Sequence, residues 1–156
     1  MKWCAAGGAL GAVMALGCAG MMVYGKEQSA VTAQPGTPCS LNYQAADGEP
    51  HNLWLDYSVA YGGGDYSVTG PITATSGGNS LGSWTMNLSR EGSPVSGGRF
   101  VINSTSSSTG AQGNAKATIF LVELPAQPTG TAVTVAGTFS AGAGTTVHNL
   151  RLVVTD

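Results

Sequence analysis

The residues best suited to covalent chemistry are a serine, a glutamate and a histidine that follow one another along the chain. The segment Gly78-Asn79-Ser80-Leu81-Gly82 fits the pattern G-x-S-x-G, in which the serine hydroxyl attacks a carbonyl carbon. Glu123 and His148 complete the order serine, acid, histidine, which suits a nucleophile, an orienting carboxylate and a general base. A small serine hydrolase using Ser80, Glu123 and His148 is therefore the enzymatic hypothesis.

That motif works only on a particular backbone. A nucleophile elbow joins a strand to a helix, which exposes the serine hydroxyl and directs backbone N–H groups at the oxyanion. Ser80 instead stands between two segments with strand periodicity, and no window after the N-terminal segment has apolar residues at helical spacing. We therefore expect Ser80 to lie in a hairpin turn, and we predict that the protein is not an enzyme, with the hydrolase as the alternative.

A second polar cluster, residues 47–51 with Asp56 nearby, combines carboxylates with an imidazole. These groups offer oxygen and nitrogen ligands to a divalent ion, but their spacing matches no metal-binding loop, and the chain has no nucleotide-binding fingerprint. We predict a polar connection here, with neither a metal nor another cofactor. His148 shares its strand parity with Leu150 and Leu152, so it is expected to be a core histidine at the sheet margin.

Three aromatic residues are the candidates for binding. Trp54 alternates out of phase with its apolar neighbours Leu53 and Leu55, and Tyr66 and Trp84 belong to other expected strands. Aromatic side chains on an exposed sheet face form a platform for a carbohydrate or a protein partner. The competing interpretation is that strands covered on both faces bury these rings.

Composition limits the class of protein. The chain has 156 residues, of which 9% are charged, with a formal net charge of -2 and 24 glycines. This length corresponds to one domain. The chain has no basic surplus with which to neutralise phosphates, so nucleic-acid binding is excluded as a function. A small, weakly charged, glycine-rich domain remains.

The hydrophobic pattern predicts strands. Apolar and polar residues alternate with a period of two, as in strands with one buried face, and glycine-rich turns separate the segments. We predict an all-β, antiparallel β-sandwich, immunoglobulin-like or similar, with about seven strands. The Ser/Thr-rich residues 104–113 are expected to form a long mobile loop. The expected strands cover residues 53–61, 66–75, 81–89, 99–103, 117–124, 131–139 and 146–154.

The N-terminus has the layout of an export signal, with Lys2 followed by an apolar run over residues 5–16. It ends in Ala15-Leu16-Gly17-Cys18-Ala19-Gly20, which resembles the lipobox of bacterial lipoproteins, with Ala15 where that motif usually has leucine. The resemblance implies that Cys18 is lipidated and becomes the new N-terminus. Two alternatives remain: soluble export after ordinary signal cleavage, and a retained anchor, because the apolar stretch approaches the ~20 residues that cross a bilayer.

These observations divide the chain into three parts. Residues 1–20 are expected to be a signal peptide or membrane anchor, residues 21–38 a flexible tether containing Pro35, and residues 39–156 the β-sandwich, with Cys39 as an unpaired thiol. We predict an exported, membrane-tethered, non-catalytic module of the cell envelope or surface, periplasmic or extracellular, with a binding or structural role. Its expected partners are membrane lipid through the anchor and a protein or carbohydrate ligand.

Overall fold

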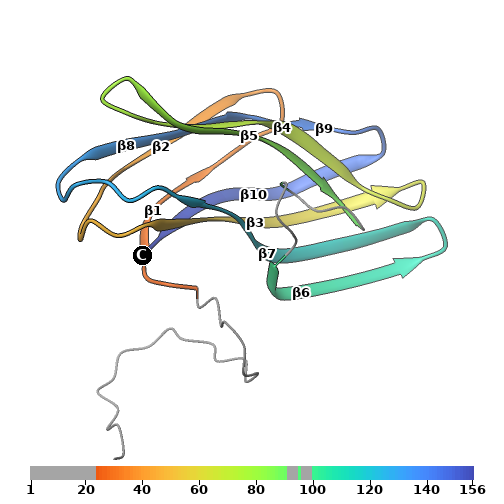
Figure 1. Cartoon of the computed structure of the whole chain (residues 1–156). Coiled ribbons are helices and arrows are strands. Elements are labelled where there is room, and N and C mark those ends of the chain that lie inside the picture. Colours follow the sequence, from red (N-terminus) through yellow and green to blue (C-terminus); the bar gives the residue numbers. More distant parts are fainter. Residues whose placement is uncertain (1–23, 91–94, 96–99) are drawn as a thin grey trace, which may run out of the picture.

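The described residues form two antiparallel sheets of five strands each, which pack face to face as a β-sandwich (Figure 1). The computed structural model describes residues 24–90, 95 and 100–156. The expected signal segment, residues 1–20, and its lipidation candidate Cys18 lie outside the described residues. The predicted fold class, an all-β antiparallel sandwich, is confirmed, with ten strands in place of about seven.

Sheet A has the strand order β1-β10-β3-β7-β6, and sheet B has the order β2-β8-β4-β5, with the short strand β9 paired to β4. The strands of sheet A are β1 (Glu27–Thr32), β10 (Thr145–Thr155), β3 (His51–Gly62), β7 (Gln112–Leu124) and β6 (Phe100–Thr109). Those of sheet B are β2 (Pro38–Gln44), β8 (Ala132–Thr138), β4 (Ser67–Ser76), β5 (Asn79–Ser89) and β9 (Ser140–Ala141).

The period-two pattern places one side of each central strand in a shared core. Along β3 the buried positions Leu53, Leu55, Tyr57, Val59 and Tyr61 alternate with less buried residues, Trp54 excepted. The facing layer of sheet B contributes side chains of the same kind at the same period. Burying these side chains between the sheets stabilises the fold, because each fully buried aliphatic or aromatic side chain contributes about 1.5–3 kcal/mol. The sheet B core residues are Leu41, Tyr43, Val68, Ile72, Ala74, Met86, Leu88, Val133 and Val135.

The prediction of a flexible tether over residues 21–38 is wrong for its central part. Residues 27–32 form β1, which pairs with β10 at the edge of sheet A. The segment gave little periodic signal because it is a polar edge strand with only Val31 packed against the core and Ala33 buried just after it. An edge strand is held by its backbone ladder more than by an apolar face.

The expected mobile loop is also wrong. Residues 104–109 belong to β6, which pairs with β7 in register from Ser104 opposite Ala117 to Thr109 opposite Gln112. The turn between the strands holds Gly110 at a φ of 61°, a conformation that glycine adopts without steric cost. Residues 104–109 are exposed, so backbone pairing, without an apolar face, holds them in the sheet (Figure 1).

Candidate functional site

The three residues of the hydrolase hypothesis lie far apart. Glu123 on β7 pairs with Asn52, whereas His148 on β10 lies beside Ser58, six residues further along β3. At about 3.3 Å per residue, this separates Glu123 from His148 by roughly 20 Å. Ser80 is the second residue of β5 in sheet B, in the other layer of the sandwich. The structure therefore does not bring Ser80, Glu123 and His148 together.

His148 is not the core histidine expected from its parity. The pairing of β10 with β3 shifts between Val147 and Asn149, so His148 is an extra residue in the strand and its side chain is exposed. A β-bulge of this kind breaks the alternation and redirects a side chain. The imidazole therefore projects into solvent.

Residues 47–50 connect β2 to β3, as predicted, whereas His51 is the buried first residue of β3. Asp47 Oδ1 accepts a hydrogen bond from the Glu49 backbone N–H at 3.0 Å, and His51 Nδ1 lies 3.0 Å from the Glu49 carbonyl oxygen. Asp56 is not part of this connection, because it lies on β3 and accepts a hydrogen bond from Thr118 of β7. Across residues 24–90, 95 and 100–156, no three His, Cys, Asp or Glu side chains come close enough to hold a metal ion.

The three aromatic candidates do not form one platform. Trp54 is 0% exposed and lies on the outer side of sheet A, where Tyr24 and Phe120 pack against it with ring centroids at 5.2 and 5.5 Å. Tyr66 is 3% exposed, within the core. Trp84 on β5 packs against the core with its ring over Gly82. The second interpretation, burial, holds for Trp54 and Tyr66.

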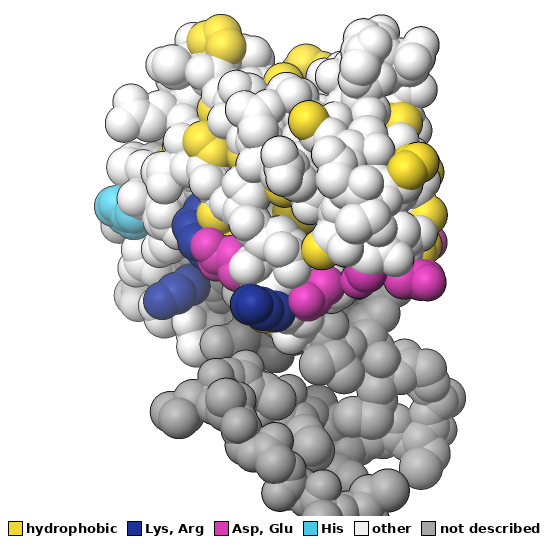
Figure 2. All heavy atoms as spheres, turned by 90° about the vertical axis from the view of Figure 1, so that its left-hand side faces the viewer, with side chains coloured by type: hydrophobic (Ala, Val, Ile, Leu, Met, Phe, Trp, Pro, Cys, Tyr) yellow, Lys and Arg dark blue, Asp and Glu magenta, His cyan; other side chains and the backbone are white. Residues whose placement is uncertain are grey.

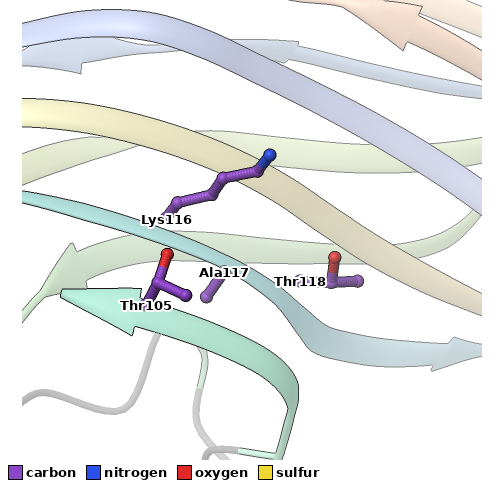
Figure 3. A pocket seen from close by; sticks show the side chains of 4 residues that line it. All are labelled: Thr105, Lys116, Ala117 and Thr118. Atoms are coloured by element: carbon purple, nitrogen blue, oxygen red, sulfur yellow. The ribbon is translucent and has the colours of Figure 1, made fainter.

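Two small hollows lie beside β6 and β7. One lies over β6 and β7, has a volume of about 130 Å³ and is lined by Thr105, Lys116, Ala117 and Thr118 (Figure 3). A neighbouring hollow of about 160 Å³ shares Thr105 and Lys116. Sites for drug-sized ligands usually enclose ~300–1,000 Å³. Both hollows are smaller than that range.

The outer face of sheet A carries a line of charges across its strands. Arg151 on β10 binds Glu27 of β1 at 2.6 Å and Asp56 of β3 at 3.3 Å. Thr118 of β7 extends the line by donating to Asp56 at 2.7 Å. Hydrogen bonding to Glu27 is the main cause that raises the pKa of Arg151. These charges are paired with one another and tie four strands together.

Sheet B has no such charges. Its described strands β2, β4, β5, β8 and β9 contain no Asp, Glu, Lys or Arg. In Figure 2, accordingly, the charged side chains gather toward the sheet A side of the molecule. The positions that alternate with the sheet B core residues are mostly Ser, Thr and Asn. The outward face of the sheet B strands is therefore uncharged and rich in hydroxyl and amide groups.

The register arranges these groups in rows across the sheet. One row runs over all four long strands through Asn42, Thr134, Thr75 and Ser80. The next runs through Ser40, Ala136, Thr73 and Ser83, and Ala136 interrupts its polar side chains. Thr134 Oγ1 donates to Asn42 Oδ1 at 2.6 Å. Neighbouring strands lie ~4.8 Å apart and outward residues recur every ~6.7 Å along a strand. This grid of hydrogen-bond donors and acceptors, which we call the hydroxyl face, is the candidate functional site.

Sequence reasoning missed the hydroxyl face, although its signal was present. Most residues that alternate with Leu41, Ile72 and Val135 are hydroxyl or amide residues, with Pro38, Pro71, Ala132 and Ala136 as exceptions. Their common position became visible only when the strand order put β2, β8, β4 and β5 side by side. Hydroxyl and amide groups both donate and accept hydrogen bonds, so the face can pair with a ligand that carries no charge.

Comparison with known protein families, with curated proteins and with solved structures finds no match to this chain. In the part of the chain that the structure describes, no helix has the length and apolarity needed to span a bilayer.

Proposed function

We propose that this protein is an exported, non-catalytic module of the cell envelope, anchored at its N-terminus through Cys18, that binds a neutral polysaccharide through its hydroxyl face. The observation that carries the proposal is the segregation of charge: the described strands of sheet B have none, and their outward positions present hydroxyl and amide groups in rows. Export and anchoring rest on the signal layout and the lipobox-like residues that end at Cys18.

A neutral polysaccharide suits this face for two reasons. Its hydroxyl groups also both donate and accept, so they can pair with Thr, Ser and Asn side chains without an ionic contribution. A neutral hydrogen bond contributes only ~1 kcal/mol, so one sugar unit binds weakly. A polymer that spans several rows gains from repeated contacts, since later contacts form at high effective concentration.

A binding experiment tests the ligand class. The domain is applied to an array of neutral and charged polysaccharides, and we expect retention on a neutral polymer with little dependence on salt, because screening acts on charges. Thr73→Glu, in the middle of the hydroxyl face, should weaken this binding by about tenfold or more, which corresponds to ~1.4 kcal/mol, because the ligand would cover an unpaired carboxylate.

Thr105→Glu is the matched control, since it makes the same change at an exposed threonine of β6 in sheet A. We expect it to bind as the unmodified protein does. Retention on charged polymers alone, or equal binding by the two variants, would contradict the proposed ligand and site. The anchor is tested separately by the intact mass of protein extracted from membranes. A mature N-terminus other than Cys18, or Cys18 without lipid mass, would contradict the anchor.

A further inference from the structure

The chain is fixed to the fold from residue 24 onward. The Tyr24 ring lies against Trp54 at a centroid distance of 5.2 Å. The next residue passes so close to the C-terminal strand that a Cβ at Gly25 would overlap the backbone oxygen of Asp156. Lys26 N–H then donates to the Asp156 carboxylate, and Asp156 N–H donates back to the Lys26 carbonyl. These contacts leave no free linker between Tyr24 and β1.

The lipid attachment point proposed at Cys18 is therefore close to the domain. Only residues 19–23 separate Cys18 from Tyr24. Even when fully extended, a chain advances at most ~3.6 Å per residue, so Tyr24 lies within roughly 20 Å of Cys18. A tether that reached residue 38 would have allowed the domain to tumble well away from the membrane, whereas this short connection does not.

We infer that the outer face of sheet A lies against the surface of the phospholipid membrane and that the hydroxyl face of sheet B points away from it. This orientation rests on the proposed lipid anchor at Cys18. The connection reaches the domain on the outer face of sheet A, where Tyr24 covers Trp54. The two sheets of a sandwich are ~10 Å apart, so the hydroxyl face is held beyond the full thickness of the domain.

The chemistry around the point of attachment fits a lipid headgroup layer. Tyr24 and Phe120, both partly exposed, flank the buried Trp54, and aromatic rings with polar groups favour the boundary between lipid and water. Burial, together with the nearby charges of Asp56 and Glu27, raises the pKa of Tyr24, so its hydroxyl stays neutral. Arg151 offsets one of the two neighbouring carboxylates, Glu27 and Asp56, so this cluster is compatible with a headgroup layer without net charge, such as phosphatidylcholine.

Two fluorescent labels test the orientation. The full chain is produced in its lipidated form with Cys39→Ser, and a cysteine for labelling is introduced by Lys116→Cys on β7 of sheet A or by Thr85→Cys on β5 of sheet B. Both positions are exposed. In vesicles of phosphatidylcholine with a spin label on the lipid headgroup, we expect fluorescence at position 116 to be quenched several-fold more than at position 85. Equal quenching, or stronger quenching at position 85, would overturn the orientation.

A variant with a 20-residue Gly/Ser insertion between Val23 and Tyr24 is the control for the short connection. A flexible linker of that length has an end-to-end distance of ~25 Å, so the difference between the labels should largely disappear. Persistence of the full difference would contradict the short connection as its cause. The intact mass of each preparation is measured first: missing lipid at Cys18 contradicts the proposed anchor, whereas lipidated protein with equal quenching contradicts the orientation alone.

Discussion

Trp54 donates its indole N–H to Thr155 Oγ1 at 3.0 Å, and both residues are 0% exposed. This hydrogen bond joins β3 to the last residue of β10 on the outer side of sheet A, beside the place where the chain enters the fold. A tryptophan whose polar edge is paired in this way is accommodated at a buried position without leaving a donor unpaired. The bond therefore helps to hold β10 to the central strand β3 on the face that Tyr24 covers.

Thr155→Val keeps the shape of the side chain and removes this acceptor. Because a neutral hydrogen bond contributes ~1 kcal/mol and a buried polar group without a partner costs more, we expect the free energy of unfolding to fall by about 1–2 kcal/mol in urea titrations. Thr155→Ser retains the hydroxyl and should recover most of that loss. Equal losses in the two variants would show that the methyl group matters, and not the hydrogen bond.

Substitution by alanine is expected to change the stability of the domain in opposite directions at Gly70 and at Gly62. A Cβ at Gly70 would overlap the Thr138 carbonyl oxygen and lie 2.9 Å from Phe139 Cα, whereas nothing lies within 4 Å of a Cβ at Gly62. Gly70→Ala must displace backbone, so we expect it to destabilise the domain by about 1–3 kcal/mol. Gly62→Ala should leave stability unchanged or raise it by up to ~1 kcal/mol, since alanine restricts the unfolded chain.

Thermal unfolding of the two alanine variants, measured side by side, checks this pair. If both variants lost the same stability, the close approach of β4 to Thr138 and Phe139 would not be the cause. Gly62 ends β3, whereas Gly70 lies inside β4, and the sequence gives no sign of what surrounds either glycine. The packing of β4 against Thr138 and Phe139 makes Gly70 the sensitive position.

The strands with an apolar face were predictable, whereas those without one were not. Leu53 to Tyr61 and Leu150 to Val154 alternate clearly because one side of each strand meets the other sheet. β1 and residues 104–109 of β6 lie at the two edges of sheet A, and their residues resemble those of linkers. Their strand conformation depends on the partners β10 and β7, so a local pattern could not predict it.

The predictions for the candidate site residues were incomplete for similar reasons. Parity placed His148 with Leu150, but an irregularity in the pairing with β3 moved it to the other side, and a shift of one residue reverses every outward assignment. Parity placed Trp54 correctly on the outer face of its strand, yet its burial depends on Tyr24 and Phe120, which come from distant parts of the chain. Long-range contacts of this kind leave no local sequence signal.

His51 presents a buried nitrogen whose removal should cost little. The residue is 1% exposed, its Nδ1 lies 3.0 Å from the Glu49 carbonyl oxygen, and its Nε2 has no hydrogen-bond partner among the described residues. The ring packs on Tyr43 at a centroid distance of 5.0 Å. His51→Phe keeps an aromatic ring there and eliminates the unpaired nitrogen, so we expect unfolding free energy within about 1 kcal/mol of the original value.

Leu53→Ala, on the same strand and also fully buried, is the reference for a real loss of packing, expected at about 2–5 kcal/mol. Chemical denaturation of both variants gives the comparison. A loss in His51→Phe as large as in Leu53→Ala would indicate that Nε2 holds a partner, such as a bound water, that contributes to stability.

Tyr43 should make the domain less stable in alkali. Burial raises the pKa of Tyr43 to about 12, against a usual value of about 10 for tyrosine. Because the folded state holds the neutral phenol more strongly than the unfolded chain does, this contribution to stability is complete below pH ~10 and is lost as the pH rises toward about 12. Tyr43→Phe cannot ionise at this position, so its unfolding free energy should fall less over that interval.

Urea titrations of both proteins between these pH values measure the difference. They are made in a Cys39→Ser background, because burial also raises the pKa of the Cys39 thiol. Parallel pH profiles for the two proteins would show that the Tyr43 phenol ionises as easily in the folded state as in the unfolded chain.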